Sequence, residues 1–306
     1  MDPQLLKRAR KKYLSARLAA ELVELKSSLY KGYRNTLACC HQVEVDDDLE
    51  LHSTFFCRRR WCSTCASINM ATLIDRYRPS VEAMKCPYFV TLTVPNCRSE
   101  EIEPTIDAMT KKWRQIADLA RKGRRYFRGI RKTELKVGKG GGFHPHFHVI
   151  VDGEEAAAWL VDQWLERWPT ASPAAQDKTR VEAIGDALVE LMKYATKLTC
   201  SENASNLVLC TPRQMDRIFR AVNGRRLIQP FGGIKAVPED AFEPTAQVVE
   251  KAKGLYTWCE IDWYHTETGE ALTGYEPKSD AEEWQKLKEE TRKRPAKRPT
   301  RRRKLA

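Results

Sequence analysis

The sequence predicts an α+β fold, in which a central antiparallel sheet of about five strands carries packed helices and follows a helical, cysteine-rich N-terminal region. Two alternating segments, residues 129–137 and 143–151, flank the Gly-rich stretch GKGGG, which predicts a β-hairpin. Apolar residues recur at helical spacing in residues 103–123 and 154–168. Five of the ten cysteines lie in residues 39–65, where neither period is visible.

The segments before the hairpin predict helices and one buried strand. Residues 5–30 place apolar side chains at helical spacing between charges, which predicts one amphipathic helix or two. Residues 86–96 are rich in β-branched and aromatic residues and predict a strand. Pro104 suits the first turn of the helix that follows, and Gly123 suits its C-cap. The predicted inward residues of this helix are Ile106, Met109, Trp113, Ile116 and Ala120.

The later segments predict two more helices and a small β element. Residues 154–168 and 185–199 have helical periodicity, and residues 256–264 read as a strand. From about residue 277 the chain consists largely of Lys, Glu, Arg and Pro, which predicts disorder. The predicted units are residues 1–82 for the N-terminal region, 83–204 for the catalytic sheet domain, 205–276 for an extension and 277–306 for a basic tail.

The charge of the chain is concentrated in two places. The formal net charge is +12, and residues 286–304 hold eleven Lys or Arg against two Glu, a net of +9. A second basic cluster, RKGRRYFRGIRK at residues 121–132, sets Tyr126 and Phe127 among cations. Clustered cations attract nucleic-acid phosphates. The alternative is a solvated helix end and a solubilising tail.

No apolar stretch of about 18 residues occurs, so we expect no membrane span. Residues 1–25 lack the apolar run and small-residue cleavage site of a secretory signal. We therefore expect a cytoplasmic protein whose cysteines are reduced or bind metal.

Three of the six histidines alternate in FHPHFHVIV, residues 143–151. Successive side chains of a strand point to opposite faces, so His144, His146 and His148 share one face. If the hairpin pairs its apolar faces, Glu134 lands on the histidine face. Two imidazoles and a carboxylate on one sheet surface make a site for a divalent metal. The alternative is the polar, water-facing side of a half-buried sheet.

The segment VELMKYATKL predicts a polar helical face of three residues. On a helix, Glu190 lies one turn before Tyr194, and Lys197 one turn after it. A tyrosine nucleophile works best with a cation nearby and a phosphorus centre polarised by metal, and a carboxylate can accept a proton. The alternative, an exposed helix face of ordinary polar residues, is common.

Together, the motifs FVTLTVPN, HPHFHVIV and ELMKYATK stand in the order of a known superfamily. The sequence resembles the HUH endonucleases, which are named for two histidines that flank a hydrophobic residue. Within that group it is similar to plasmid rolling-circle replication initiators with a single catalytic tyrosine. The resemblance spans about residues 55–200.

The resemblance implies a role for each matching residue. His146 and His148 match the metal-binding pair, Glu134 matches the acidic ligand on the adjacent strand, and His144 could replace or support one ligand. Tyr194 matches the nucleophile. The remaining two implied residues are Glu190, which would activate water or substrate when the reaction ends, and Lys197, which would bind the scissile phosphate. The implied metal is Mg²⁺ or Mn²⁺.

The cysteine block predicts a structural zinc site. Cys57, Cys62 and Cys65 have the spacing C-x4-C-x2-C, which includes a zinc-knuckle pair. Cys40 or Cys39 would supply the fourth thiolate, with two nearby histidines in reserve. The resemblance agrees, since many such initiators carry a block similar to CRRRWCSTC. The alternative is a set of buried free thiols.

The resemblance implies an enzyme that nicks and rejoins one DNA strand at a replication origin through a 5′-phosphotyrosyl intermediate and releases a 3′-OH primer. The expected partners are single-stranded or hairpin origin DNA, a host helicase and a DNA polymerase. We expect DNA contacts from the arginines of the zinc loop and the internal basic cluster, namely Arg58, Arg59, Arg60, Arg124, Arg125, Arg128 and Arg131.

Three alternatives remain at this point. Another HUH enzyme, a relaxase or single-strand transposase, would share the chemistry. A histidine-triad nucleotide hydrolase would have nearly the same histidine pattern but a histidine nucleophile. A zinc-dependent DNA-binding protein would bind DNA without cutting it.

Overall fold

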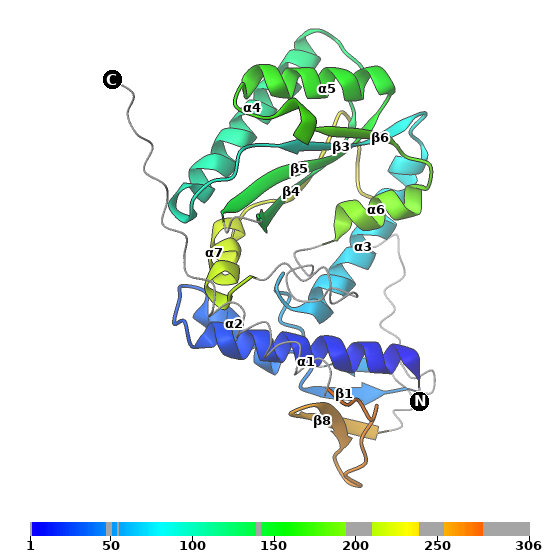
Figure 1. Cartoon of the computed structure of the whole chain (residues 1–306). Coiled ribbons are helices and arrows are strands. Elements are labelled where there is room, and N and C mark those ends of the chain that lie inside the picture. Colours follow the sequence, from blue (N-terminus) through cyan, green and yellow to red (C-terminus); the bar gives the residue numbers. More distant parts are fainter. Residues whose placement is uncertain are drawn as a thin grey trace, which may run out of the picture.

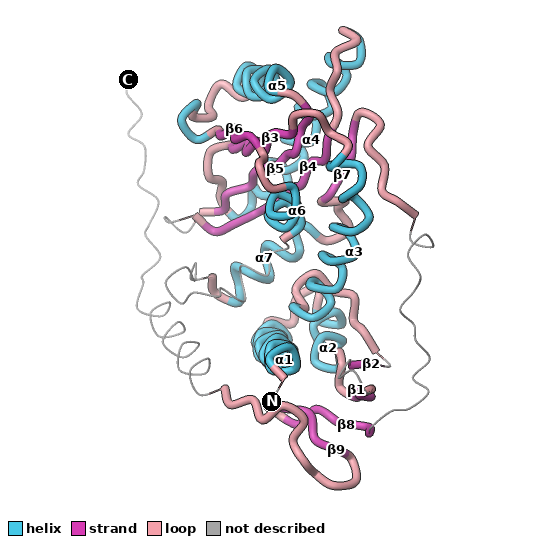
Figure 2. The backbone as a smooth tube through the Cα atoms, turned by 90° about the vertical axis from the view of Figure 1, so that its right-hand side faces the viewer, coloured by secondary structure: helices cyan, strands magenta, loops and turns pink. Residues whose placement is uncertain are grey.

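The computed structural model describes residues 2–46, 51–53, 55–138, 142–193, 210–238 and 254–277. The five-stranded sheet lies at one end of the molecule and a smaller four-stranded sheet at the other (Figures 1 and 2). Both sheets are wholly antiparallel. The predicted α+β architecture with a five-stranded antiparallel sheet is therefore confirmed.

The large sheet has the order β6-β3-β5-β4-β7, so the histidine strand β5 is central. The predicted strands are confirmed, and two short edge strands that the sequence pattern did not indicate complete the sheet. Its strands are β3 (Pro87–Thr93), β4 (Gly129–Val137), β5 (Phe143–Asp152), β6 (Asp177–Arg180) and β7 (Ile228–Phe231).

Two helices cover one face of this sheet, α4 (Ile102–Lys122) and α5 (Glu154–Arg167). The five residues predicted to face inward on α4 are all buried. Four of the five, all but Ile106, lie in one core cluster with Phe147 and Trp164, together with Val149 and Val151 of β5. Because these apolar residues alternate with the histidines along the chain, their burial turns the imidazoles to the other face.

Among the described residues, two further helices pack on one end of the second face. There, α3 (Ser63–Glu82) and α6 (Ile184–Met192) pack on Ile130 and Ile150 of the central strands. The predicted helix 185–199 is shorter than expected, because α6 ends at Met192 and the backbone of Lys193 is not helical. Two predicted site residues, Tyr194 and Lys197, lie outside the described residues.

The small sheet, of order β2-β1-β8-β9, joins the two ends of the described chain. The cysteine-rich stretch expected to be irregular supplies two of its strands, and the single strand expected at residues 256–264 is a hairpin. Its strands are β1 (Gln42–Val45), β2 (Leu51–Ser53), β8 (Gly254–Cys259) and β9 (Asp262–His265).

A third core joins three helices to the large sheet. Helices α1 (Pro3–Val23), α2 (Tyr30–Ala38) and α7 (Pro212–Val222) pack there against the hairpin end of the large sheet at Leu135 and Val137. Residues after 204 contribute strands to both sheets. The division of the chain into four units remains a prediction. Two 3₁₀ turns, Ser99–Glu101 and Pro173–Ala175, complete the described elements.

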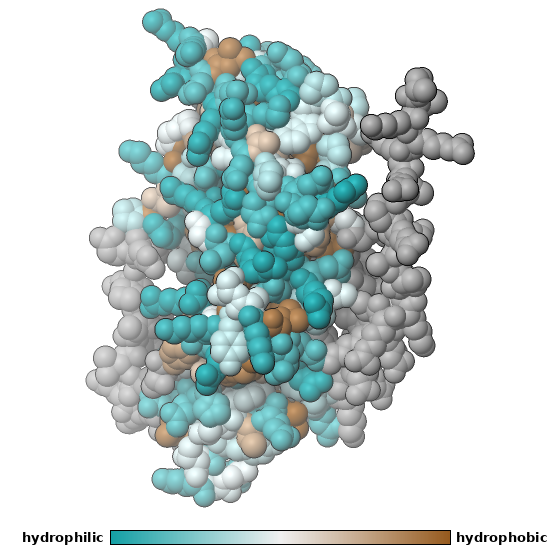
Figure 3. Space-filling model, turned by 90° about the vertical axis from the view of Figure 1, so that its left-hand side faces the viewer, coloured by the Kyte–Doolittle hydropathy of each residue, from teal (hydrophilic) through white to brown (hydrophobic). Residues whose placement is uncertain are grey.

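The surface is consistent with a protein that faces water. The face on the left of Figure 1 is mainly hydrophilic, with apolar side chains in small scattered groups (Figure 3). Among the described helices, none combines the length and the apolar character needed to cross a lipid bilayer.

Candidate active site and metal centres

Three predicted ligands converge on the second sheet face, where both histidines are buried and Glu134 is partly buried. In the β4–β5 pairing, Glu134 stands directly opposite His146, so it lies on the histidine face, as predicted. The two Nε2 atoms of His146 and His148 are 3.1 Å apart. Glu134 Oε1 is 3.9 Å from His146 Nε2, and Glu134 Oε2 is 3.5 Å from His148 Nε2. These three residues could hold one metal ion.

Hydrogen-bond partners at Nδ1 orient the rings of His146 and His148 so that their Nε2 atoms face each other. His146 Nδ1 lies 3.1 Å from the carbonyl oxygen of His144, which can only accept, so Nδ1 carries the proton and Nε2 the lone pair. His148 Nδ1 pairs with Thr91 Oγ1 at 3.2 Å. Such contacts behind the ligand fix ring orientation in metal sites. Burial lowers the pKa of His146 to about 3 and that of His148 to about 4, so both rings are neutral, as metal binding requires.

Two lysines surround the carboxylate. Lys132 Nζ donates to Glu134 Oε2 at 2.9 Å, and Lys136 Nζ lies 3.1 Å from Oε1. Burial disfavours the charged carboxylate, but the positive charges of Lys132 and Lys136 hold the pKa of Glu134 well below its usual value. Glu134 is therefore an anion ready to bind a cation.

The fourth candidate ligand, His144, is not among the converging residues. Its Nδ1 pairs with Asn96 Oδ1 at 2.8 Å, and its ring stacks on His146 with centroids 5.2 Å apart. The structure thus gives this histidine a place beside the ligand group.

A residue outside the three sequence motifs, Lys132, connects the end of α6 to this ligand group. Lys132 Nζ also donates to the carbonyl oxygen of Lys193, the last described residue before residue 194. Glu190 pairs with Lys193 Nζ at 3.0 Å, and its charge acts on both Lys132 and His148. Strand alternation could have placed Lys132 on the ligand face, whereas the roles of Thr91 and the Lys193 carbonyl depend on strand and helix packing.

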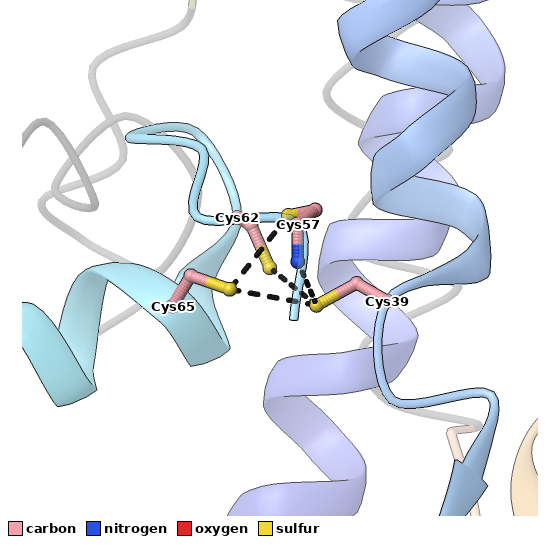
Figure 4. Close-up of side chains that lie close together, drawn as sticks. All are labelled: Cys39, Cys57, Cys62 and Cys65. Atoms are coloured by element: carbon pink, nitrogen blue, oxygen red, sulfur yellow. Dashed lines mark hydrogen bonds between the residues drawn. The ribbon is translucent and has the colours of Figure 1, made fainter. Parts of the chain in front are cut away.

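Four cysteines form a second group, all of them buried. Figure 4 shows Cys39 after α2, Cys57 and Cys62 on the loop that leads to α3, and Cys65 in the first turn of that helix. The Sγ atom of Cys39 lies 3.5 Å from that of Cys65 and 3.7 Å from that of Cys62, and the Cys57–Cys65 separation is 3.7 Å. The edges of a tetrahedral tetrathiolate zinc site are about 3.8 Å.

The structure decides which upstream cysteine completes this group. Cys39 is the fourth member and Cys40 is not, so the alternative with Cys40 is wrong. Cys40 has a φ of +53°, and this turn places the two neighbouring side chains differently. Its carbonyl oxygen instead accepts from Trp263 Nε1 of the C-terminal hairpin. His52, a reserve candidate, pairs with Asp46 at 2.7 Å.

A buried lysine of α1 lies beside the cysteines. Lys12 Nζ donates to the carbonyl oxygens of Leu37 and Cys39, at 2.8 and 2.5 Å, and lies 5.6 Å from the centroid of the Trp258 ring. Its charge also acts on four of the cysteines. Sequence patterns gave no signal for Lys12, because it is one of many charged residues in an amphipathic helix.

The predicted DNA-binding arginines fall into two groups. Arg58, Arg124 and Arg125 are exposed, and the last stacks on Trp159 with its guanidinium carbon 4.8 Å from the ring centroid. The others are at least partly withdrawn from the surface. They are Arg59, which lies over Trp61; Arg60, which donates to the carbonyl oxygens of Val222 and Arg225; Arg128, which has a buried Nε; and Arg131.

The prediction that Arg131 binds DNA is wrong. This residue is 1% exposed, and its guanidinium carbon lies 4.2 Å from the Phe147 ring centroid, under α4. Its NH2 donates to Gln229, while its Nε and NH1 have no hydrogen-bond partner among the described residues. The basic cluster was read as one surface, but strand β4 begins at Gly129 and turns alternate side chains inward.

Comparison with known proteins agrees with this geometry. Residues 48–157 match the family described as "Replication protein", and this segment contains Glu134, His146, His148 and three of the four grouped cysteines. This part of the chain is similar to the Rep replication proteins.

Curated Rep relatives have low identities to this chain. "Protein rep" of a Bacillus species is 28% identical over 132 residues, which cover 40% of this chain and 43% of that protein. "Protein rep" of Lactiplantibacillus plantarum is 26% identical over 226 residues, 64% of this chain and 70% of that protein. For the relative from Lentilactobacillus hilgardii the match covers 37% of its length, at 24% identity. The chain thus spans less than half of two of these Rep proteins, and no solved structure matches it.

Proposed function

We propose that this protein is a plasmid rolling-circle replication initiator that nicks and rejoins one strand of origin DNA. The observation that carries the proposal is the convergence of Glu134, His146 and His148 on one sheet face, within a segment similar to replication proteins. Two neutral imidazoles and a carboxylate suit a divalent cation such as Mn²⁺ or Mg²⁺. When bound, such an ion would polarise the scissile phosphate.

Tyr194 is the proposed nucleophile. Its phenol oxygen attacks the phosphorus and loses its proton, a 5′-phosphotyrosyl bond forms, and the bond from phosphorus to the 3′ oxygen breaks. The leaving oxygen takes up a proton and becomes the 3′-OH that primes synthesis. Support comes from the residue before it, since the carbonyl of Lys193 is hydrogen-bonded beside the ligand carboxylate through Lys132.

Glu190 and Lys197 complete the proposed chemistry. Glu190 stands on the last turn of α6, where its charge acts on His148, and it would accept a proton from water or from a DNA hydroxyl when the round ends. Lys197, outside the described residues, would bind the scissile phosphate.

The cysteine group has a separate proposed task. Four thiolates fit Zn²⁺, whose tetrahedral sites of this kind stabilise small domains. The bound ion would hold the loop that carries the exposed Arg58. We propose that this loop and the exposed Arg124 and Arg125 contact DNA phosphates, with a host helicase and polymerase acting on the opened strand.

The deciding experiment compares wild type with Tyr194→Phe on labelled single-stranded origin DNA in Mn²⁺, with and without chelator. Wild type should form a covalent adduct only with metal, and Tyr194→Phe should form none while it still binds DNA. An adduct in the variant would contradict the assignment of the nucleophile. DNA binding without cleavage in wild type would instead favour a non-catalytic DNA-binding protein.

A relaxase or a single-strand transposase would give the same adduct. The names of the relatives favour replication, because each is a "Protein rep". Initiation is tested by priming: polymerase added after the nick should extend the released 3′-OH around a circular origin template.

A further inference from the structure

We propose that Lys132 is a positioning residue that ties the end of α6 to the carboxylate of the metal-ligand group. The expected effect on DNA cleavage rests on the proposed function. The pair of hydrogen bonds from Lys132 to Glu134 and to the Lys193 carbonyl, called the tie below, involves described residues only. Nothing in the three motifs of the sequence assigns a role to this lysine.

The contacts of Lys132 reach two elements at once. Its side chain is 5% exposed, and its ammonium donates to Glu134 Oε2 at 2.9 Å and to the carbonyl oxygen of Lys193. The same carboxylate oxygen faces His148 Nε2 at 3.5 Å. One ammonium therefore bridges a ligand oxygen and the backbone that leaves α6.

The position suits a cation. The last carbonyl groups of a helix have no partner within the helix and carry partial negative charge, so an ammonium is stabilised there. Lys193 N still donates to Val189 O at 2.9 Å, so its carbonyl lies at the point where the helix ends. A buried ammonium needs several acceptors, and the carboxylate and this carbonyl supply them.

Lys136 provides a matched comparison. It pairs with the other oxygen of the same carboxylate at 3.1 Å, but its side chain is 38% exposed. Removing either lysine takes one positive charge from Glu134, yet only Lys132 also donates to the carbonyl at the end of α6. The difference between the two variants therefore isolates the tie from the charge.

The consequence for the reaction is geometric. The residue after Lys193 is the proposed nucleophile, so the tie sets where the chain leaves the ligand group. Displacements of about 1 Å near a reacting centre cost up to roughly 100-fold in rate.

The experiment uses the full chain and the variants Lys132→Met, Lys132→Arg and Lys136→Met. Three quantities are measured for each: Mn²⁺ affinity, hydrogen exchange of the amides of residues 188–193, and the single-turnover rate of adduct formation against DNA concentration. Thermal unfolding confirms that each variant is folded.

We expect Lys132→Met to speed exchange at the end of α6 and to lower the maximal adduct rate about 10- to 100-fold, with the half-saturating DNA concentration changed less than about threefold. Lys136→Met should leave exchange unchanged and alter the rate less than about threefold. Lys132→Arg should restore part of the lost rate, because a guanidinium can donate to both acceptors.

Equal effects of Lys132→Met and Lys136→Met on exchange would overturn the inference. If wild type forms no adduct at all, the proposed function fails. The exchange data then judge the tie alone: faster exchange only in Lys132→Met supports it, and unchanged exchange contradicts it.

Discussion

The four-cysteine group and the Glu134–His146–His148 group differ in the number of ligands that the described residues supply. The four cysteines are all buried, come from the end of a helix, a loop and the start of another helix, and bring their Sγ atoms within 4.8 Å of one another. The second group takes three ligands from two neighbouring strands, two buried histidines and a partly buried carboxylate. Closed sites stabilise folds, and sites with a free position perform chemistry. The comparison predicts that damage to the first group unfolds the protein and damage to the second leaves it folded and inactive.

The largest expected effect is that of Cys62→Ser. This change removes one of four thiolates from a core that also holds Trp258 and Trp263 of the C-terminal hairpin. Because the binding energy of a structural zinc, of the order of 10 kcal/mol, is largely folding energy, the zinc content should fall to near zero and the small sheet should unfold. Zinc analysis, tryptophan fluorescence and limited proteolysis measure this.

The control for that prediction is Cys259→Ser, at an exposed cysteine outside the group. It should keep one zinc per chain and wild-type fluorescence. A folded Cys62→Ser protein with full zinc content would show that the group does not bind the metal.

The next largest effect concerns the Glu134–His146–His148 group. His148→Ala should abolish Mn²⁺ binding and lower adduct formation at least about 100-fold, because a catalytic ligand is lost. Its melting temperature and its zinc content should stay near wild type. His144→Ala, whose ring stacks on His146 and pairs with Asn96, should lose less than about tenfold in rate. Similar losses in rate for His144→Ala and His148→Ala would show that His144 is also a metal ligand.

A smaller effect is expected for Lys12→Met. The buried ammonium lies beside an anionic tetrathiolate, and its removal should weaken zinc affinity about tenfold with little change in fold. The matched control is Lys11→Met, which removes the neighbouring charge from a lysine that pairs with Ser67 instead. Competition with a chromogenic chelator measures the zinc affinity of both variants. Equal affinities would show that the Lys12 ammonium does not stabilise the zinc tetrathiolate.

The smallest effect lies between the two groups, where Arg217 of α7 pairs with Glu103 of α4. The guanidinium holds the pKa of Glu103 below its usual value against the effect of burial. A lowered folded-state pKa stabilises the fold above the unfolded value of about 4.3 and ceases to do so as the pH falls through the folded value. Glu103→Gln should therefore cost about 0.5 kcal/mol at pH 7 and less near pH 3.

Urea unfolding at the two pH values measures this difference, with the exposed Glu100→Gln as the control. A loss that persists at low pH would show that the contact acts by packing and not by charge.

Local patterns were enough for most of the large sheet and for one metal-ligand group. Period-two alternation predicted β4 and β5 to within a residue, and the pairing of apolar faces placed Glu134 opposite His146. Helical periodicity and end signals predicted α4 and its buried face. These features involve neighbours in the sequence, so nearby residues determine them.

Long-range packing decided what local pattern could not. The choice of Cys39 over Cys40 depends on a backbone turn and a contact with Trp263, more than 200 residues away. Arg131 looked like part of a basic surface until the strand turned it under α4. The sequence by itself determined the ligands, their faces and the family resemblance, because these follow from residue type and short-range geometry. Only the tertiary structure decided which charges are buried and that Lys132 joins α6 to the ligand carboxylate, because such contacts form between elements that the chain keeps far apart.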